Sequence, residues 1–189
     1  MKKRKIIRLK GYDYSKEGWY FVTIEPYNRN YSFCSISNGK IELSEIGKII
    51  DRQWAWIFSR YDHILMDEYI IMPDHFHGII RILPDSLLDE KRKSLFVSQE
   101  DVRATLESPF RPREALEPPV HLYQNHSKRI GLSHIIGAFK TTSSKRIHSA
   151  RYPDFKWKRS FHDRILREDE LEIKRRYIRN NPIKWKNNY

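Results

Sequence analysis

Apolar positions recur with two different periods along this chain, and the period in each segment predicts its secondary structure. Residues 19–24 are all aromatic or β-branched, which favours a β-strand. A second strand or ribbon is expected across residues 32–43, interrupted by Asn38-Gly39, a pair typical of tight hairpin turns. Two further apolar segments, 63–72 and 75–83, also predict strands. The Pro-Asp pair between these two predicts a turn joining antiparallel neighbours, with a single bent strand as the alternative.

Three other segments predict helices, two of them from the helical spacing of their apolar residues. Ser44 can cap a helix that runs to about residue 59, and a second amphipathic helix is expected over residues 132–147. A third helix is expected over residues 168–180, because this segment begins with acidic residues and ends with basic ones, as the helix dipole favours. Pro182 is expected to stop or distort that helix just beyond its last turn. Residues 157–165 predict a short strand or turn.

These elements mix without regular βαβ alternation, which predicts an α+β sandwich with an antiparallel sheet and helices on one face. The length of 189 residues suits a single domain spanning the whole chain. Residues 84–130 differ in character, since they hold five of the nine prolines and many charged residues. We expect this segment to be a long mobile insertion or lid within the domain.

The charge balance narrows the class of partner. The chain has 36 Lys and Arg against 24 Asp and Glu, a formal net charge of +12, which suits a nucleic acid; a surface that only promotes solubility is the alternative. The single cysteine, Cys34, excludes an internal disulfide and a cysteine-rich zinc site. Residues 1–10 do not form a secretory signal, and there is no apolar run of the roughly 20 residues that a membrane helix needs. A soluble, cytoplasmic protein that is nucleoid-associated when bound to DNA is expected.

The segment His75-Phe76-His77 is the densest chemical signal in the sequence. Residues two apart in a strand point to the same side, so His75 and His77 would present two imidazoles together. Two neutral imidazoles can supply two ligands of a divalent metal, and a third ligand must come from elsewhere in the chain. The alternative is a pair of hydrogen-bonded structural histidines that bind no metal.

A second signal lies in the last predicted helix, where Tyr177 and Asn181 are four residues apart and therefore share one face. The side-chain oxygen of Asn181 could complete a metal site, because Mg²⁺ and Mn²⁺ take oxygen ligands. Basic neighbours such as Lys174 favour the phenolate form of a tyrosine nucleophile. The alternative is that Tyr177 is a core residue whose hydroxyl reaches the surface.

Taken together, residues 19–23, 67–78 and 177–182 resemble the single-tyrosine HUH transposases, which include the REP-associated tyrosine transposases of bacteria. Residues 135–140 and 157–161 also look like that family, so the resemblance spans nearly the whole chain except the proline-rich segment. It implies a ferredoxin-like α+β domain with the histidines on a central strand and Tyr177 on a neighbouring helix.

The reaction implied by the resemblance is a metal-dependent transesterification of single-stranded DNA. Tyr177 would attack a DNA phosphate, giving a 5′-phosphotyrosine link and a free 3′-OH, and Mg²⁺ or Mn²⁺ bound by His75, His77 and Asn181 would polarise the phosphate. Such enzymes typically recognise DNA hairpins, and a homodimer is conceivable. Two other functions stay open: a metal-dependent phosphodiesterase that uses water, and a hairpin-binding protein that does not cut.

Basic residues outside the metal site are candidates for DNA contacts. The basic arm at residues 1–10 could hold backbone phosphates, and the alternative for every such residue is a solvated charged surface. The individual residues that we predict to bind DNA are Lys140, Lys145, Arg146, Arg175 and Arg179.

Overall fold

The structure is a computed structural model that describes residues 9, 11–88 and 130–185. Four strands form an antiparallel sheet in the order β4-β5-β1-β6. They are β1 (Gly18–Ile24), β4 (Ile64–Ile71), β5 (Phe76–Ile82) and β6 (His162–Leu166). The helix α1 (Glu45–Arg60) lies between β1 and β4 in the chain, and α3 (Leu132–Ser149) lies between β5 and β6. This order and these two connections make a ferredoxin-like α+β sandwich, so the predicted fold class is confirmed.

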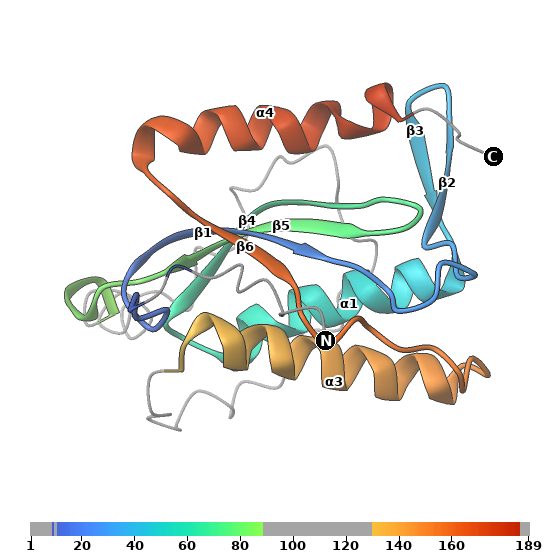
Figure 1. Cartoon of the computed structure of the whole chain (residues 1–189), viewed down its shortest axis with the longest axis horizontal. Coiled ribbons are helices and arrows are strands. Elements are labelled where there is room, and N and C mark those ends of the chain that lie inside the picture. The colour runs from blue at the N-terminus through green and yellow to red at the C-terminus, as the bar shows by residue number, and fades with distance from the viewer. Residues whose placement is uncertain (1–8, 10, 89–129, 186–189) are drawn as a thin grey trace, which may run out of the picture.

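Helices cover both faces of the sheet (Figure 1): α1 and α3 pack on one face, and α4 (Glu168–Lys184) crosses the other. Alternation along β1 explains this arrangement. Tyr20 and Val22 belong to the core with α1 and α3, whereas Phe21 between them packs with Leu171 and Ile178 of α4. The expectation that helices lie on one face alone is therefore wrong, because the sheet is apolar on both sides and each side needs cover.

A separate hairpin, β2 (Cys34–Ser37) and β3 (Lys40–Leu43), stands beside the end of α4 (Figure 1). Its tip consists of Asn38 and Gly39, both with positive φ (51° and 73°), as the tight turn predicted from this pair requires. Ile36 and Ile41 pack against the same apolar cluster as α4. The predicted ribbon is confirmed.

The helix ends follow the predicted signals with one exception. Ser44 caps α1, since its Oγ accepts a hydrogen bond from the Gly47 N–H at 3.1 Å. The last helix was expected to end near residue 180, but α4 continues to Lys184 with Pro182 inside it. Proline has no N–H, so the hydrogen bond that residue 182 would donate to the carbonyl of residue 178 is missing, and α4 continues for only two residues beyond it.

Two predicted segments lie outside the described residues for the most part: the basic arm at 1–10 and the insertion at 84–130. Within the part of the chain that the structure describes, no helix combines the length and the apolar character needed to cross a membrane.

Candidate active site

The tight turn at residues 73–74 places two histidines side by side at the start of β5. His77 is the second residue of the strand, and His75 lies in the turn just before it, where its carbonyl accepts a hydrogen bond from the Met72 N–H at 2.8 Å. The two imidazole centroids are 4.5 Å apart. The structure therefore brings together the two side chains that the sequence paired, although His75 is not itself in the strand.

Each imidazole is held through its Nδ1 atom. Nδ1 of His75 lies 2.6 Å from Oδ1 of Asp74, and Nδ1 of His77 lies 2.8 Å from Oγ1 of Thr23, the residue paired with His77 on β1. A proton on Nδ1 leaves the lone pair of Nε2 for a ligand. Metal-binding histidines are commonly oriented by such contacts.

The surroundings of His77 keep its imidazole neutral. Its side chain is only 5% exposed, and burial together with the neighbouring His75 and Lys174 lowers the pKa of His77 to about 3. At neutral pH the ring therefore carries no charge, which is the form in which histidine binds a metal.

Tyr177 reaches this pair from α4, across the apolar face of the sheet. Its hydroxyl lies 3.4 Å from Nε2 of His77, and its ring packs against those of His77 and Phe21, with centroid separations of 5.4 and 6.0 Å. The side chain is still 44% exposed. One phenol thus touches the buried imidazole and remains accessible to a large substrate.

A lysine supplies positive charge beside the phenol. Nζ of Lys174 lies 5.2 Å from the centre of the Tyr177 ring and 4.8 Å from that of Phe21. Burial and the charge of Arg164 lower the pKa of Lys174. An ammonium group in this place stabilises negative charge that develops on the phenol oxygen.

Asn181 lies one helical turn after Tyr177 and one turn before Trp185. Tyr177 contacts His77, and the Trp185 ring lies 6.1 Å from that of His75, so the face that includes Asn181 is turned toward the histidine pair. Nδ2 of Asn181 is buried and has no hydrogen-bond partner among the described residues. Turning the amide by half a rotation exchanges this nitrogen for the oxygen.

The donor set fits a divalent cation. Two imidazole nitrogens and one amide oxygen leave room for water or phosphate oxygens, which Mg²⁺ and Mn²⁺ retain readily. Among the described residues, no three His, Cys, Asp or Glu side chains gather closely enough to hold a metal by themselves. A cation at this site would therefore depend on Asn181 and on oxygen atoms from outside the protein.

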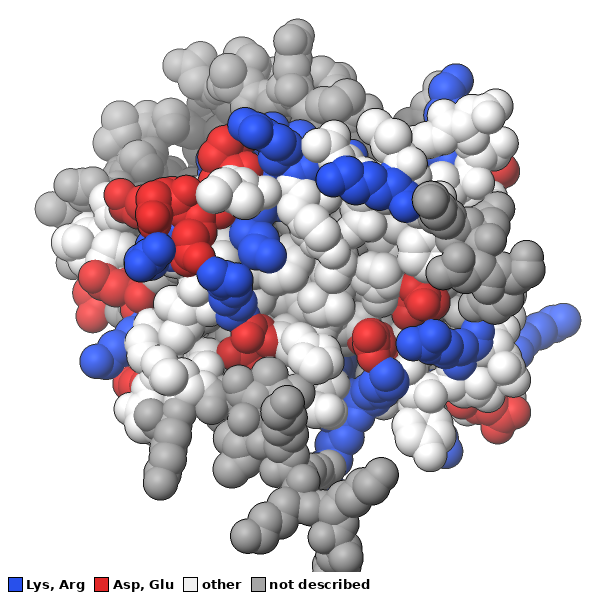
Figure 2. Space-filling view, turned by 45° about the horizontal axis from the view of Figure 1, so that its top comes forward, with Lys and Arg blue, Asp and Glu red and all other residues white. Residues whose placement is uncertain are grey.

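The five residues predicted to bind DNA do not gather around the phenol. Lys145 and Arg146 are exposed on α3, on the opposite side of the sheet from α4. Nζ of Lys140 donates hydrogen bonds to the carbonyls of residues 158 and 160, at 2.9 and 3.1 Å. Arg175 and Arg179 are paired with carboxylates of β4 and α4. Figure 2 shows basic and acidic side chains intermixed around a broad uncharged area. The DNA contacts remain predictions.

Two residues next to the site had no role in the sequence analysis. Thr23 faces His77 because of the register between β1 and β5, which a single sequence does not reveal. Trp185 follows Asn181 by four residues, so its place on the same helical face was available from spacing, had the helix been extended past Pro182.

Comparison with known proteins gives one clear relative. An uncharacterized protein of Haemophilus influenzae is 31% identical over 185 residues, which cover 96% of this chain and 89% of that protein. The chain belongs to the same family as this protein. No protein-family model matches the chain.

Among solved structures, a REP-associated tyrosine transposase bound to a REP hairpin has a similar fold. The TM-score is 0.54 at 14% sequence identity, and the match covers 94% of this chain and 73% of the transposase. At this identity the likeness establishes the fold, a four-stranded antiparallel sheet covered by helices.

Proposed function

We propose that this chain is a tyrosine transposase-type enzyme that cleaves and rejoins single-stranded DNA, with Tyr177 as its nucleophile. The observation that carries the proposal is the 3.4 Å approach of the Tyr177 hydroxyl to Nε2 of His77, from a residue 100 positions away in the sequence. The transposase with the same fold is bound to a REP hairpin, which supports hairpin DNA as the substrate. The net charge of +12 suits such a polyanion.

The reaction exchanges one phosphate ester for another. The Tyr177 oxygen bonds to the phosphorus while the bond from phosphorus to O3′ breaks, and the departing oxygen takes a proton to become a 3′-OH. The phenol proton passes to solvent. The phosphate keeps its bond to O5′ and so links Tyr177 to the 5′ end of the DNA, and attack by a 3′-OH can reverse the step without ATP. The sequence accordingly has no P-loop motif.

The residues around Tyr177 support this chemistry in separate ways. His75, His77 and Asn181 would hold Mg²⁺ or Mn²⁺, and a cation bound there would polarise the phosphate and stabilise its developing charge. Asp74 and Thr23 contact the Nδ1 atoms of the two imidazole rings, which leaves both Nε2 atoms available for the metal. Lys174 offers positive charge to the phenol oxygen.

The test uses labelled single-stranded DNA from the flanks of the chain's own gene, incubated with Mg²⁺ or Mn²⁺ and run on a denaturing gel. We expect a labelled band that migrates with the protein. Tyr177→Phe should abolish that band and leave DNA binding intact, because only the hydroxyl is lost. Tyr27→Phe is the matched control, since Tyr27 is 75% exposed and contributes nothing to this site. An adduct that persists in Tyr177→Phe refutes the assignment.

The denaturing gel, together with a native gel of the same mixtures, distinguishes the two other functions. A phosphodiesterase that activates water would cleave the DNA without any link to protein and would retain activity in Tyr177→Phe. A hairpin-binding protein that does not cut would shift the DNA on a native gel but show no metal-dependent cleavage. The sequence leaves a homodimer open, and no observation tests it.

A further inference from the structure

The helix that carries Tyr177 is divided lengthwise into three stripes. At about 100° per residue, the buried stripe of α4 lies between two flanks that face different strands. The buried stripe consists of Leu171, Ile178 and Pro182. One flank holds Tyr177 and Asn181 next to the histidines, and the other holds Glu172, Arg175 and Arg179.

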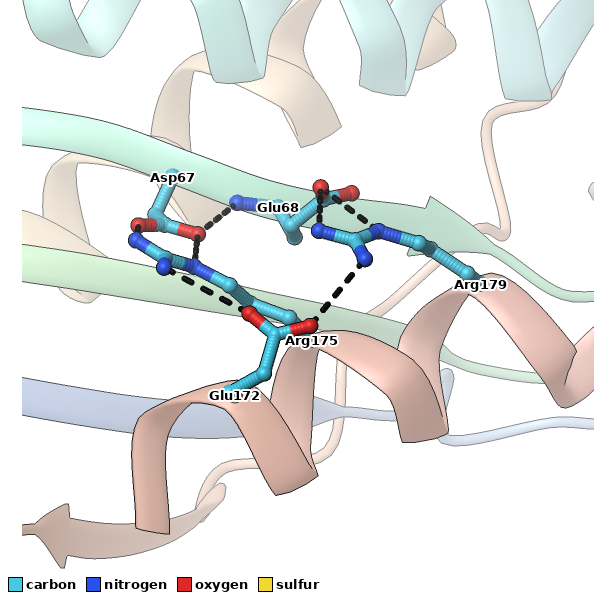
Figure 3. Close-up of polar contacts among 5 residues, drawn as sticks. All are labelled: Asp67, Glu68, Glu172, Arg175 and Arg179. Atoms are coloured by element: carbon cyan, nitrogen blue, oxygen red, sulfur yellow. Dashed lines mark hydrogen bonds and ion pairs between the residues drawn. The ribbon is translucent and has the colours of Figure 1, made fainter. Parts of the chain in front are cut away.

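A network of ion pairs and hydrogen bonds, in which arginines alternate with carboxylates, binds this second flank to the edge strand β4 (Figure 3). Arg175 binds Asp67 with two atoms, Nε to Oδ1 at 2.9 Å and Nη2 to Oδ2 at 2.5 Å. Arg179 binds Oε1 of Glu68 through Nε at 3.0 Å and Nη2 at 2.9 Å. Glu172 lies between the two guanidinium groups and accepts from Arg179 at 3.2 Å. We call these five residues the charge clamp.

A β-bulge makes the charge clamp possible. Neighbouring residues of a regular strand point to opposite faces, so Asp67 and Glu68 should not both reach α4. The pairing of β4 with β5 shifts register between Met66 and Tyr69, which are the residues on either side of this acidic pair. The Glu68 N–H donates to Oδ1 of Asp67 at 2.7 Å and closes the bulge. Both carboxylates consequently face the helix, as Figure 3 shows.

Within the clamp, the pair of Asp67 and Arg175 is the more desolvated one, and this favours a fixed geometry. The Asp67 side chain is 10% exposed, and a bidentate guanidinium–carboxylate pair has a fixed orientation as well as charge. Burial alone would raise the pKa of Asp67, but the hydrogen bonds from Arg175 and from the Glu68 N–H lower it below its ordinary value. Asp67 is therefore an anion at neutral pH.

We propose that Asp67 and Glu68 are positioning residues, which fix the rotation of α4 through Arg175 and Arg179 and so set the approach of Tyr177 to His77. The inference rests on the proposed function. A helix with side chains has an outer radius of about 5–6 Å, so a roll of about 10° moves the tip of a side chain by about 1 Å. The clamp and Tyr177 lie on opposite flanks, which means that a roll that stretches the clamp lifts or lowers the phenol.

The variant Asp67→Asn distinguishes this positioning role from a direct role of Arg175 and Arg179 in DNA binding. If the two arginines bind DNA directly, that substitution would release Arg175 for phosphates and tighten DNA binding. If the carboxylate positions the helix, the variant should bind DNA as the control does and react more slowly. The control is Asp169→Asn, which removes the same charge from an exposed pair with Arg167 at the start of α4.

The experiment measures the rate constant of adduct formation in a single turnover with saturating DNA. This rate constant does not depend on the fraction of folded protein, so a variant that is only less stable keeps it. We expect Asp67→Asn and the more exposed Arg179→Gln to lower it about 10- to 100-fold, the usual effect of a misplacement near 1 Å. The single variant Arg179→Glu should also be slow, because the introduced carboxylate would repel Glu68. Adding Glu68→Arg exchanges the two charges and should restore part of the lost rate. Rates equal to that of Asp169→Asn, or tighter DNA binding at an unchanged rate, overturn the proposal.

A second measurement tests the clamp without any activity. The Tyr177 and His77 rings are close enough for a nuclear Overhauser contact between their protons, with centroids 5.4 Å apart. Loss of that contact in Asp67→Asn and Arg179→Gln, but not in Asp169→Asn, supports the proposal; a retained contact overturns it. If the wild-type chain forms no adduct, the proposed function fails, and this contact alone decides whether the clamp positions the helix.

Discussion

Gly78 follows His77 in β5 and lies over the indole of Trp54, so replacing it with alanine tests the packing beneath the histidine pair. A Cβ atom at Gly78 would lie 2.6 Å from Cζ2 of Trp54 and 3.0 Å from Cε1 of Phe76. Carbon atoms in contact are normally about 3.5–4.0 Å apart. The indole or the strand must therefore move by about 1 Å.

Trp54 has no space into which it can withdraw. Its side chain is fully buried, and its ring contacts those of Phe58, Phe76 and Phe139 at centroid distances of 5.2, 4.6 and 5.2 Å. Overpacking of this kind costs about 1–3 kcal/mol. In a domain of this length, each kcal/mol lowers Tm by about 2–4 °C. Gly78→Ala should accordingly lower the free energy of unfolding by about 1–3 kcal/mol.

Gly137→Ala is the matched control and should have the opposite sign. Gly137 lies inside α3, and a Cβ atom there meets nothing within 4 Å. Alanine in a helix interior is favoured over glycine by about 0.5–1 kcal/mol, so this variant should be more stable than the wild type. Urea unfolding of the three proteins, followed by circular dichroism at equal m, measures both differences. A Gly78→Ala midpoint at or above that of the wild type would refute the packing argument.

Two further predictions concern single carboxylates. Asp74→Asn should weaken Mn²⁺ binding about 10- to 100-fold in calorimetric titrations, because the carboxylate that orients His75 is lost; an affinity equal to that of Asp169→Asn contradicts this. Burial raises the pKa of Asp51 above its ordinary value, despite the hydrogen bond from Tyr69. A raised pKa in the folded state means that stability is present at low pH and is lost as the pH rises through that pKa. The unfolding free energy of Asp51→Asn relative to wild type should therefore increase between pH 3 and pH 7, and a difference that stays constant or decreases contradicts the burial argument.

Local sequence patterns predicted the structure correctly where it depends on residues that are close together in the chain. The pair Asn38-Gly39 specifies a turn through its own backbone preferences, and Ser44 caps α1 through a contact three residues away. The face covered by α4 was missed for a different reason. Whether Phe21 needs cover depends on the apolar residues that other strands add to the same face, such as Ile79, and a single segment does not contain that information.

In the candidate site, too, some features follow from local sequence and others depend on the pairing of distant segments. Strand periodicity paired His75 with His77, although His75 lies in the turn just before β5. The link to Tyr177 came from a resemblance, since no spacing rule connects residues 100 positions apart. Periodicity was misleading for Asp67 and Glu68, which it assigns to opposite faces. The bulge reverses that assignment, and bulges arise from the pairing of two strands rather than from one of them.

Net charge predicts a class of partner more readily than it predicts individual contacts. A formal charge of +12 is unaffected by ion pairing, so its attraction for a polyanion at long range persists. A contact, in contrast, needs a cationic group that is not already engaged. The Lys140 ammonium is bound to backbone carbonyls, and the guanidinium groups of Arg175 and Arg179 are bound to carboxylates. We therefore propose a geometric role for Arg175 and Arg179, the placement of Tyr177, rather than a direct contact with DNA.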